Sequence, residues 1–91
     1  MKWDPQVEAL LDRLVSKQPE GFRAMSRPIY SQGAESMAQE RGSTVVEERD
    51  LLLTILAEVP HYVREKVLDG LEKEGIDLEK YKRLLPEGWD D

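Results

Sequence analysis

His61 is the only histidine in the 91-residue chain, which contains no cysteine. A catalytic histidine works with a nucleophile or an orienting carboxylate, and a structural zinc site needs several thiolate or imidazole ligands. No Ser or Cys pattern near His61 suggests such a nucleophile, and no second His or Cys could share a metal ion. The sequence therefore predicts no catalytic residue, no metal site and no cofactor. His61 is expected either to be a structural residue at a helix start or to contact a ligand or partner.

Acidic side chains are abundant, but they stand among Lys and Arg at helical spacings. Glu65 with Asp69, and Glu72 with Lys73, are typical of solvated helix faces with ordinary ion pairing. A general acid or base needs burial or a strong neighbour to shift its pKa, and the sequence marks no carboxylate in that way. Glycine-rich phosphate loops and EF-hand patterns are also absent. We expect a protein that is not an enzyme, although a site formed at an oligomer interface stays a third hypothesis.

Two arginines share a spacing that could matter for binding. Arg27 precedes Glu35 by eight residues, and Arg64 precedes Glu72 by the same interval. Eight residues are a little more than two helical turns, so neither pair can bond directly within one helix. One interpretation is that each arginine ties the start of its helix to a neighbouring helix.

The alternative interpretation is an exposed anchor for a protein partner. Arg64 stands beside His61 and Tyr62, and Arg and Tyr are frequent hot-spot residues in interfaces. The candidate partner-binding residues are therefore His61, Tyr62, Arg64 and Arg27.

The distribution of charge limits the classes of partner. The net charge is −6, and all of it arises in residues 46–91, which hold seven basic and thirteen acidic groups. Affinity for nucleic acid depends largely on Lys and Arg, so this half disfavours nucleic acid. Residues 13–27 contain four basic residues and one acid, and are the one stretch that could attract an anion. A protein partner is the expectation, with a homodimer as a further possibility.

The hydrophobic pattern predicts helices along the chain. Asp4 and Pro5 are typical of a helix start, and the apolar stripe that follows predicts a first helix that Pro19 and Gly21 end. A second helix is expected from about Pro28 to Arg41, with Gly42 as its left-handed cap. Its small residues, which should let another helix approach closely, are Gly33, Ala34 and Ala38.

Residues 43–46 are expected to form a short extended link. Thr44-x-x-Glu47 resembles a capping box that would start a third helix, apolar nearly all round and therefore central in the core. Pro60 should open a fourth helix that Gly75 stops, and Asp77 should cap a short fifth one before Pro86. Its expected inward residues are Leu78, Tyr81, Leu84 and Leu85.

These elements predict an all-α fold in a single domain over residues 1–91. We expect a small bundle of about five helices, with a weak internal duplication (residues 3–53 and 56–85) as one further hypothesis. No apolar run approaches the roughly 20 residues that span a bilayer, and residues 1–5 lack the apolar stretch of a signal peptide. A cytoplasmic location without membrane contact is expected.

Three groups of residues resemble a known family. They are Trp3-x-x-x-Val7, Glu35-x-x-Ala38-x-x-x-Gly42 followed by Thr44, and Pro60-x-x-Val63-Arg64-x-x-Val67 leading to Glu72. Together they are similar to the small C-terminal helical domain of light-independent protochlorophyllide reductase and its short stand-alone relatives. The order differs, because in that family the Pro-x-x-Val-Arg group comes before the Glu-x-x-Ala group. The resemblance implies that the chain is an accessory module that docks on a larger redox or tetrapyrrole-related enzyme. The implied partner is thus a larger oxidoreductase.

A second likeness concerns residues 34–51. The stretch from Ala34 through Thr44 and Val45 to Asp50 resembles the second half of a histone fold, where a long helix leads to a Thr-Val loop and an Asp-headed helix. The interval from Thr to Asp is one residue longer here. This likeness implies a histone-fold-like helix–strand–helix core with an appended helical hairpin. It also carries the alternative function, a histone-like DNA-binding dimer.

Overall fold

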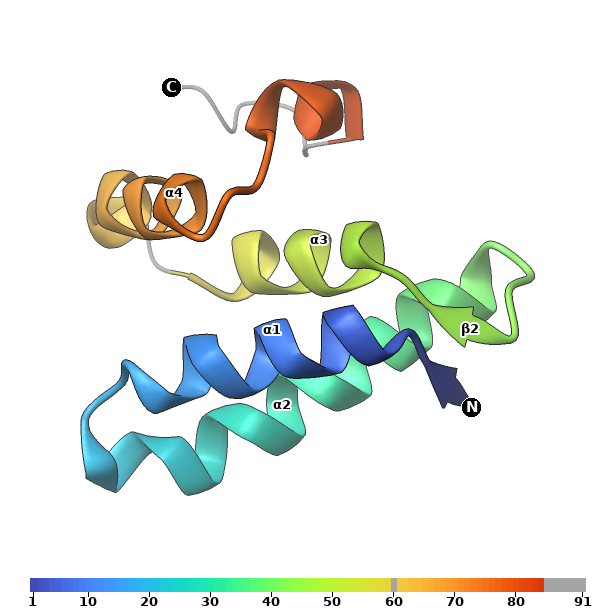
Figure 1. The fold of residues 1–91 in the computed structure, drawn as a ribbon, viewed down its shortest axis with the longest axis horizontal. Helices are drawn as coiled ribbons and strands as arrows, with labels where there is room; N and C mark the ends of the chain where they lie inside the picture. The colour runs from blue at the N-terminus through green and yellow to red at the C-terminus, as the bar shows by residue number, and fades with distance from the viewer. Residues whose placement is uncertain (60, 85–91) are drawn as a thin grey trace. The chain divides into compact units, whose positions relative to one another are not determined.

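The computed structural model describes residues 1–59 and 61–84 of the chain (Figure 1). The chain divides into two compact units, Met1–Thr54 and Ile55–Asp91. The first unit contains β1 (Lys2–Trp3), α1 (Pro5–Ser16), α2 (Glu20–Glu40), β2 (Val45–Val46) and the start of α3 (Glu48–Glu58). The second contains the end of α3, η1 (His61–Val63), α4 (Arg64–Lys73) and η2 (Leu78–Leu84), where η1 and η2 are 3-10 helices.

Helix α1 forms as its sequence predicts. The Asp4 side chain accepts a hydrogen bond from the Gln6 amide at 2.9 Å, and Pro5 occupies the first helical position, where no amide is needed. The helix buries one apolar stripe, which consists of Val7, Leu10, Leu11 and Val15. Helix α1 packs against α2, which lies beside it in Figure 1.

Helix α2 begins eight residues earlier than predicted. It starts at Glu20, directly after Pro19, and continues through Pro28 to Glu40. The prediction of a start at Pro28 was wrong. A proline inside a helix has no amide hydrogen to donate, so the carbonyl four residues earlier loses its partner, and this loss costs least where water can bond to that carbonyl. Pro28 and Ala24, whose carbonyl loses its partner, are both exposed. Gly42 has the predicted left-handed conformation, with φ of 77°.

The two strands form a small parallel sheet within the first unit. Lys2 pairs with Val45 and Trp3 with Val46. The Lys2 amide donates to the Thr44 carbonyl at 3.2 Å, and the Asp4 amide donates to the Val46 carbonyl at 3.1 Å. The extended link at residues 43–46 was predicted, whereas β1 was not. The sheet fixes the start of the chain beside the loop between α2 and α3.

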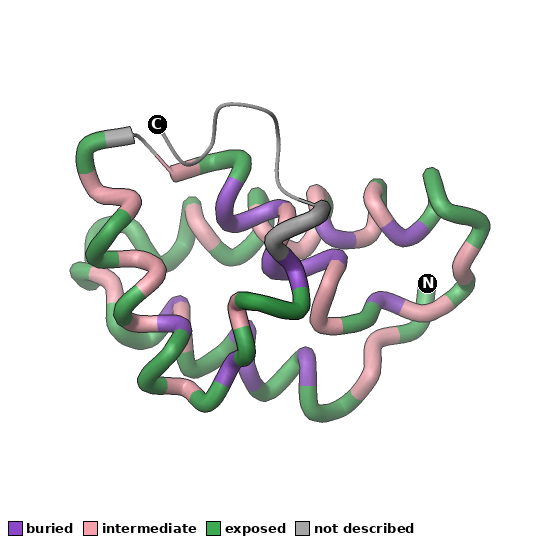
Figure 2. The backbone as a smooth tube through the Cα atoms, turned by 90° about the horizontal axis from the view of Figure 1, so that it is seen from above, coloured by how far each residue is buried: buried purple, intermediate pink, exposed green. Residues whose placement is uncertain are grey.

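Among the described helices, α3 contains the largest number of buried residues. Leu51 and Leu52 are fully buried in the first unit, and Ile55 and Leu56 expose 5% and 2% of their surface in the second. In Figure 2 buried residues recur between exposed ones along the helices. The prediction that this helix is apolar nearly all round and lies in the core agrees with this burial.

In the second unit a glycine follows the end of α4 and an aspartate precedes η2, as predicted. Gly75 has φ of 86°, and the Glu79 amide donates to Asp77 Oδ1 at 3.1 Å. The fifth predicted helix is the 3-10 helix η2, with Tyr81 buried and Leu78 half-buried. Pro60, Leu85 and Pro86, together with the side chain of Leu84, lie outside the described part of the chain.

The mostly helical fold is confirmed for the described residues, with four α-helices, two 3-10 helices and the two-stranded sheet. The single domain, the duplication and the histone-fold likeness stay predictions.

Gly33 is a point of close approach between α2 and α3, and this gives a first testable prediction. A Cβ atom at Gly33 would overlap Thr54 Cγ2, and Thr54 is held by a 2.8 Å hydrogen bond from its Oγ1 to the Asp50 carbonyl. Overpacking of this kind costs about 1–3 kcal/mol. Gly33→Ala should therefore lower the melting temperature.

A second substitution separates this clash from other effects of alanine. Thr54→Ser removes Cγ2 and keeps the hydroxyl, so Gly33→Ala in that background should be neutral or stabilising by up to about 1 kcal/mol, the helix preference of alanine over glycine. Equal destabilisation in both backgrounds would show that Thr54 does not cause the loss.

Candidate functional site

A polar cluster among the described residues joins the end of α2 to the start of α3. Arg41 Nε donates to Asp50 Oδ1 at 2.8 Å and Arg41 Nη2 to Asp50 Oδ2 at 2.7 Å, a bidentate pair. Arg41 Nη2 also donates to Glu47 Oε2 at 2.9 Å. Only 1% of the Asp50 surface is exposed, whereas the Glu47 side chain is 55% exposed. We call Arg41, Glu47 and Asp50 the arginine clamp.

The clamp also caps α3. The Glu47 amide donates to Asp50 Oδ2 at 2.8 Å, and the Glu47 carbonyl accepts from the amides of Asp50 and Leu51. Glu47 is thus the cap residue and Asp50 reaches back to it from the third helical position. The prediction that Thr44 caps this helix through Glu47 was wrong by three residues, because the Thr44 carbonyl is used by the sheet.

Electrostatics keep the clamp charged. Burial alone would raise the pKa of the Asp50 carboxyl, but hydrogen bonds from Arg41 and the Glu47 amide, together with the charges of Arg41 and Arg49, hold that pKa below its ordinary value. The hydrogen bond to Asp50 in turn raises the pKa of Arg41 above its ordinary value. Both oxygens of Asp50 are occupied by donors, so the clamp holds two helices together and offers no base to a substrate.

The predicted partner-binding residues differ in what they can offer a partner. Tyr62 in η1 exposes 86% of its surface, more than any other large hydrophobic residue in the described part of the chain. Arg64 is half-buried at the first position of α4 and takes part in interactions of its own. The side chain of His61 lies outside what the structure describes. Among the members of this group whose side chains the structure describes, Tyr62 is therefore the best placed to contact another molecule.

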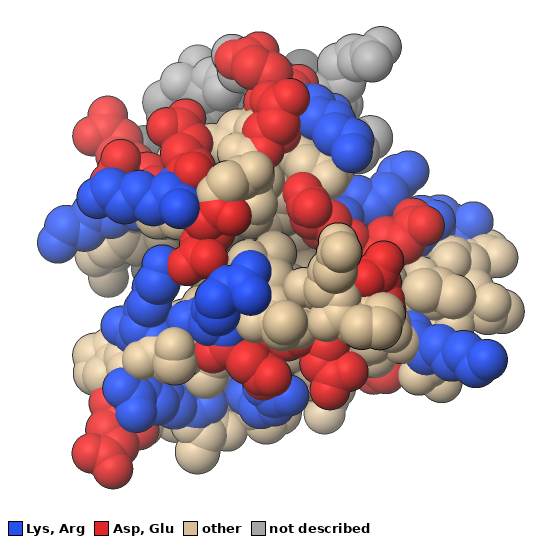
Figure 3. All heavy atoms as spheres, viewed as in Figure 1, with Lys and Arg blue, Asp and Glu red and all other residues tan. Residues whose placement is uncertain are grey.

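Arg27 contacts α1. Its guanidinium forms an ion pair with Asp12, and Arg23 Nε donates to the Gln18 carbonyl at 2.9 Å. Arg13 and Lys17 also have interactions within the chain. In the face drawn in Figure 3, Lys and Arg are interspersed with Asp and Glu rather than gathered in one patch. The basic residues at 13–27 thus serve internal contacts and do not form a patch of unpaired cations.

Helix α2 exposes an apolar stripe that was not predicted from the sequence. Phe22, Met25 and Ile29 are 59%, 62% and 46% exposed. Their spacing of three and four residues sets them on one side of the helix. The intervals were readable in the sequence, but only the packing of α1 on the other side of α2 shows that this side is exposed.

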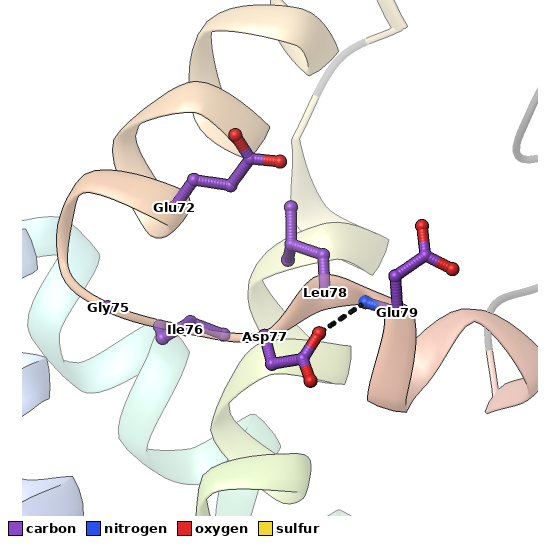
Figure 4. Close-up of a pocket in the computed structure, with 6 residues that line it drawn as sticks. All are labelled: Glu72, Gly75, Ile76, Asp77, Leu78 and Glu79. Atoms are coloured by element: carbon purple, nitrogen blue, oxygen red, sulfur yellow. Dashed lines mark hydrogen bonds between the residues drawn. The ribbon is translucent and has the colours of Figure 1, made fainter.

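A shallow hollow lies in the second unit between the end of α4 and the start of η2 (Figure 4). Its volume is about 420 Å³, and its lining residues are Glu72, Gly75, Ile76, Asp77, Leu78 and Glu79. Three carboxylates around an open hollow give it a negative character, and Asp77 is engaged by the Glu79 amide. Within residues 1–59 and 61–84 no group of three or more His, Cys, Asp or Glu is placed to hold a metal ion.

No helix among the described residues is both long enough and apolar enough to cross a membrane. Comparisons of the chain with protein-family models, with curated proteins and with solved structures found no match.

Proposed function

We propose that this chain is a non-catalytic accessory module that binds a larger protein. The observation that carries the proposal is the exposure of Tyr62, at 86% of its surface, in the turn of η1 that leads into α4. A tyrosine supplies a large, rigid apolar surface and a hydroxyl at low cost in conformational entropy, which is why it is enriched at interface hot spots. A tyrosine side chain that contacts only water does not stabilise the fold.

The polar residues of the fold support a structural rather than a chemical role. In the arginine clamp both oxygens of Asp50 accept hydrogen bonds from the chain itself. Arg27 is paired with Asp12. These groups stabilise the fold and leave the exposed aromatic surface for recognition.

The proposed partner is a larger redox or tetrapyrrole-related enzyme. This part rests on the sequence resemblance to the small helical domain of light-independent protochlorophyllide reductase. In that arrangement His61 and Arg64 would flank the Tyr62 contact. The chain would position or regulate the enzyme and would contribute no group to its reaction.

The proposal predicts that Tyr62→Ala leaves the fold intact and weakens partner capture. Truncating a hot-spot tyrosine costs about 2 kcal/mol or more, which corresponds to roughly a thirtyfold loss of affinity. Proteins retained by the immobilised chain from its native extract would be quantified by mass spectrometry for the parent and for Tyr62→Ala. Glu65→Ala, an exposed residue three positions further on, is the matched control.

The expected result is a set of retained proteins that includes an oxidoreductase, survives Glu65→Ala and is depleted by Tyr62→Ala. Undiminished retention by the Tyr62 variant would contradict the role of Tyr62. Binding to random duplex DNA that falls steeply with salt would instead support the histone-like alternative.

A further inference from the structure

We infer that the first half of α2 is a strap that unfolds locally while the rest of the first unit stays folded, with Pro28 as its hinge. The strap consists of residues 20–29. All of them are exposed except Ser26, which is half-buried. The buried residues of α2, Ala34 and Ala38, both follow Pro28. Packing therefore stabilises the second half of the helix and contributes little to the first.

The apolar side chains of the strap do not hold it in place. Phe22, Met25 and Ile29 are already 59%, 62% and 46% exposed in the folded helix. Burial stabilises a segment in proportion to the apolar surface that it removes from water. Because about half or more of each side chain stays in contact with water, unfolding the strap gives up little hydrophobic stabilisation.

The backbone of the strap is also weakly stabilised. Pro28 has no amide hydrogen, so the bond to the Ala24 carbonyl, one of those that would join the strap to the second half of the helix, is missing. At the other end, the cap residue Pro19 offers no side-chain hydrogen bond to the free amides of the first turn. Gly21 has a low preference for helix, and a Cβ atom built there would meet nothing within 4 Å. Both ends of the strap are therefore weak points.

The polar contacts of the strap lie at the surface. The ion pair between Arg27 and Asp12 of α1 joins side chains that are 45% and 55% exposed. The bond from Arg23 Nε to the Gln18 carbonyl is exposed as well. Exposed pairs contribute little to stability because water competes for both partners. These contacts orient the strap on α1 but add little to its stability.

The second half of α2 is anchored by contrast. Gly33 packs against Thr54, and the arginine clamp joins the end of α2 to the start of α3. Opening of the strap therefore stops near Pro28 and leaves this half folded. It frees Asp12 and converts the turn between α1 and α2 into a connection that runs from residue 17 to residue 29. The opened strap is then a site in the first unit at which a protease can cut.

Hydrogen exchange of the full chain tests the inference, measured by mass spectrometry at several low concentrations of denaturant and corrected for intrinsic rates. The amides of residues 24–27 and 29–31 should exchange at least about tenfold faster than those of residues 34–40. Their rate should hardly change with denaturant, because opening the strap exposes little new surface. Exchange at residues 34–40 should rise steeply, because it requires unfolding of the core.

Two substitutions connect the opening to the weak points of the strap. Gly21→Ala should slow exchange of the strap amides about fivefold, which is the helix preference of alanine over glycine, because the new methyl group meets no neighbour. Pro28→Ala restores the missing hydrogen bond and should slow the same amides about tenfold or more. Ser36→Ala, at an exposed position in the second half of α2, is the matched control and should leave exchange of the strap unchanged.

Cleavage by thermolysin measures the opening a second time. This protease cuts unfolded chain before large apolar residues such as Phe22, Met25 and Ile29, and the rate of these cuts should fall in Gly21→Ala and Pro28→Ala as exchange does. The inference would be overturned by strap amides that are as protected, or respond to denaturant as steeply, as residues 34–40. Exchange that Gly21→Ala leaves unchanged, or equally fast exchange throughout α2, would overturn it as well. The result is independent of the Tyr62 test.

Discussion

Replacing Leu52 by alanine should lower the free energy of unfolding by about 2 to 5 kcal/mol, the range for deleting a buried leucine side chain. Leu52 is fully buried in α3. Ile55→Ala, one turn further along the same helix, should cost a similar amount. Denaturant unfolding followed by circular dichroism measures both losses.

Leu53→Ala is the matched control for this prediction. Leu53 belongs to the same helix and is only half-buried, so the same truncation should cost clearly less. For a chain of 91 residues each kcal/mol corresponds to about 4–8 °C in melting temperature. Melting of Leu52→Ala and Ile55→Ala within a few degrees of the parent would show that α3 is not central to the core.

The arginine clamp gives the second large expected effect. Asp50→Asn keeps the shape of the side chain but removes the negative charge that Arg41 binds. It also replaces one of the two oxygen acceptors, which receive hydrogen bonds from the Arg41 guanidinium and the Glu47 amide. Losing hydrogen bonds to a charged group should cost about 1.5–3 kcal/mol. Glu47→Gln is the control, because this carboxylate is 55% exposed and a surface pair contributes less than about 1 kcal/mol.

The effect of Asp50→Asn should depend on pH. The pKa of Asp50 is lowered in the folded protein, so its carboxylate stabilises the fold fully above its unfolded pKa of about 3.9. That contribution is lost as the pH falls from there through the lower folded-state pKa. The stability gap between the parent and Asp50→Asn should be constant above about pH 5 and shrink below about pH 4. A gap that stays unchanged down to pH 2 would contradict the lowered pKa.

Local signals in the sequence were sufficient for much of the fold. Asp4 and Asp77 cap the elements expected of them, and Gly42 and Gly75 have the left-handed conformation at helix ends. These features depend on a few adjacent residues, so a pattern reveals them. The small size of Gly33 also predicted a close helix approach, which the contact with Thr54 confirms.

Features that depend on distant partners were not predicted. Nothing near Lys2 indicates that it pairs with Val45, because a two-residue strand has no periodicity. Pro28 suggested a helix start because proline is favoured in the first turn of a helix. The structure places it inside α2, where it is tolerated because it is exposed, and the sequence does not show which residues are exposed. The bond from Arg41 to Asp50 joins two helices across a loop. The three-residue interval from Glu47 to Asp50 was the one local sign of that clamp.

The candidate binding surfaces show the same division. Sequence composition pointed to Tyr62 as a hot-spot type, but only its exposure separates it from Tyr81, which is buried. Arg27 was grouped with Arg64 because each precedes a glutamate by eight residues, but the structure pairs Arg27 with Asp12. The stripe on α2 was missed because an apolar triplet at helical spacing usually belongs to a core.

The central claim, that the surface around Tyr62 binds a larger protein, is tested most directly by photo-cross-linking from position 62. The chain would carry a photoreactive phenylalanine derivative at residue 62 or, as a control, at the exposed residue Glu65, and would be irradiated in its native extract. We predict that position 62 yields one dominant adduct with an oxidoreductase and that the unlabelled parent chain competes for it. If position 62 gave no protein adduct, or only adducts that the unlabelled parent chain does not reduce, the account would be contradicted.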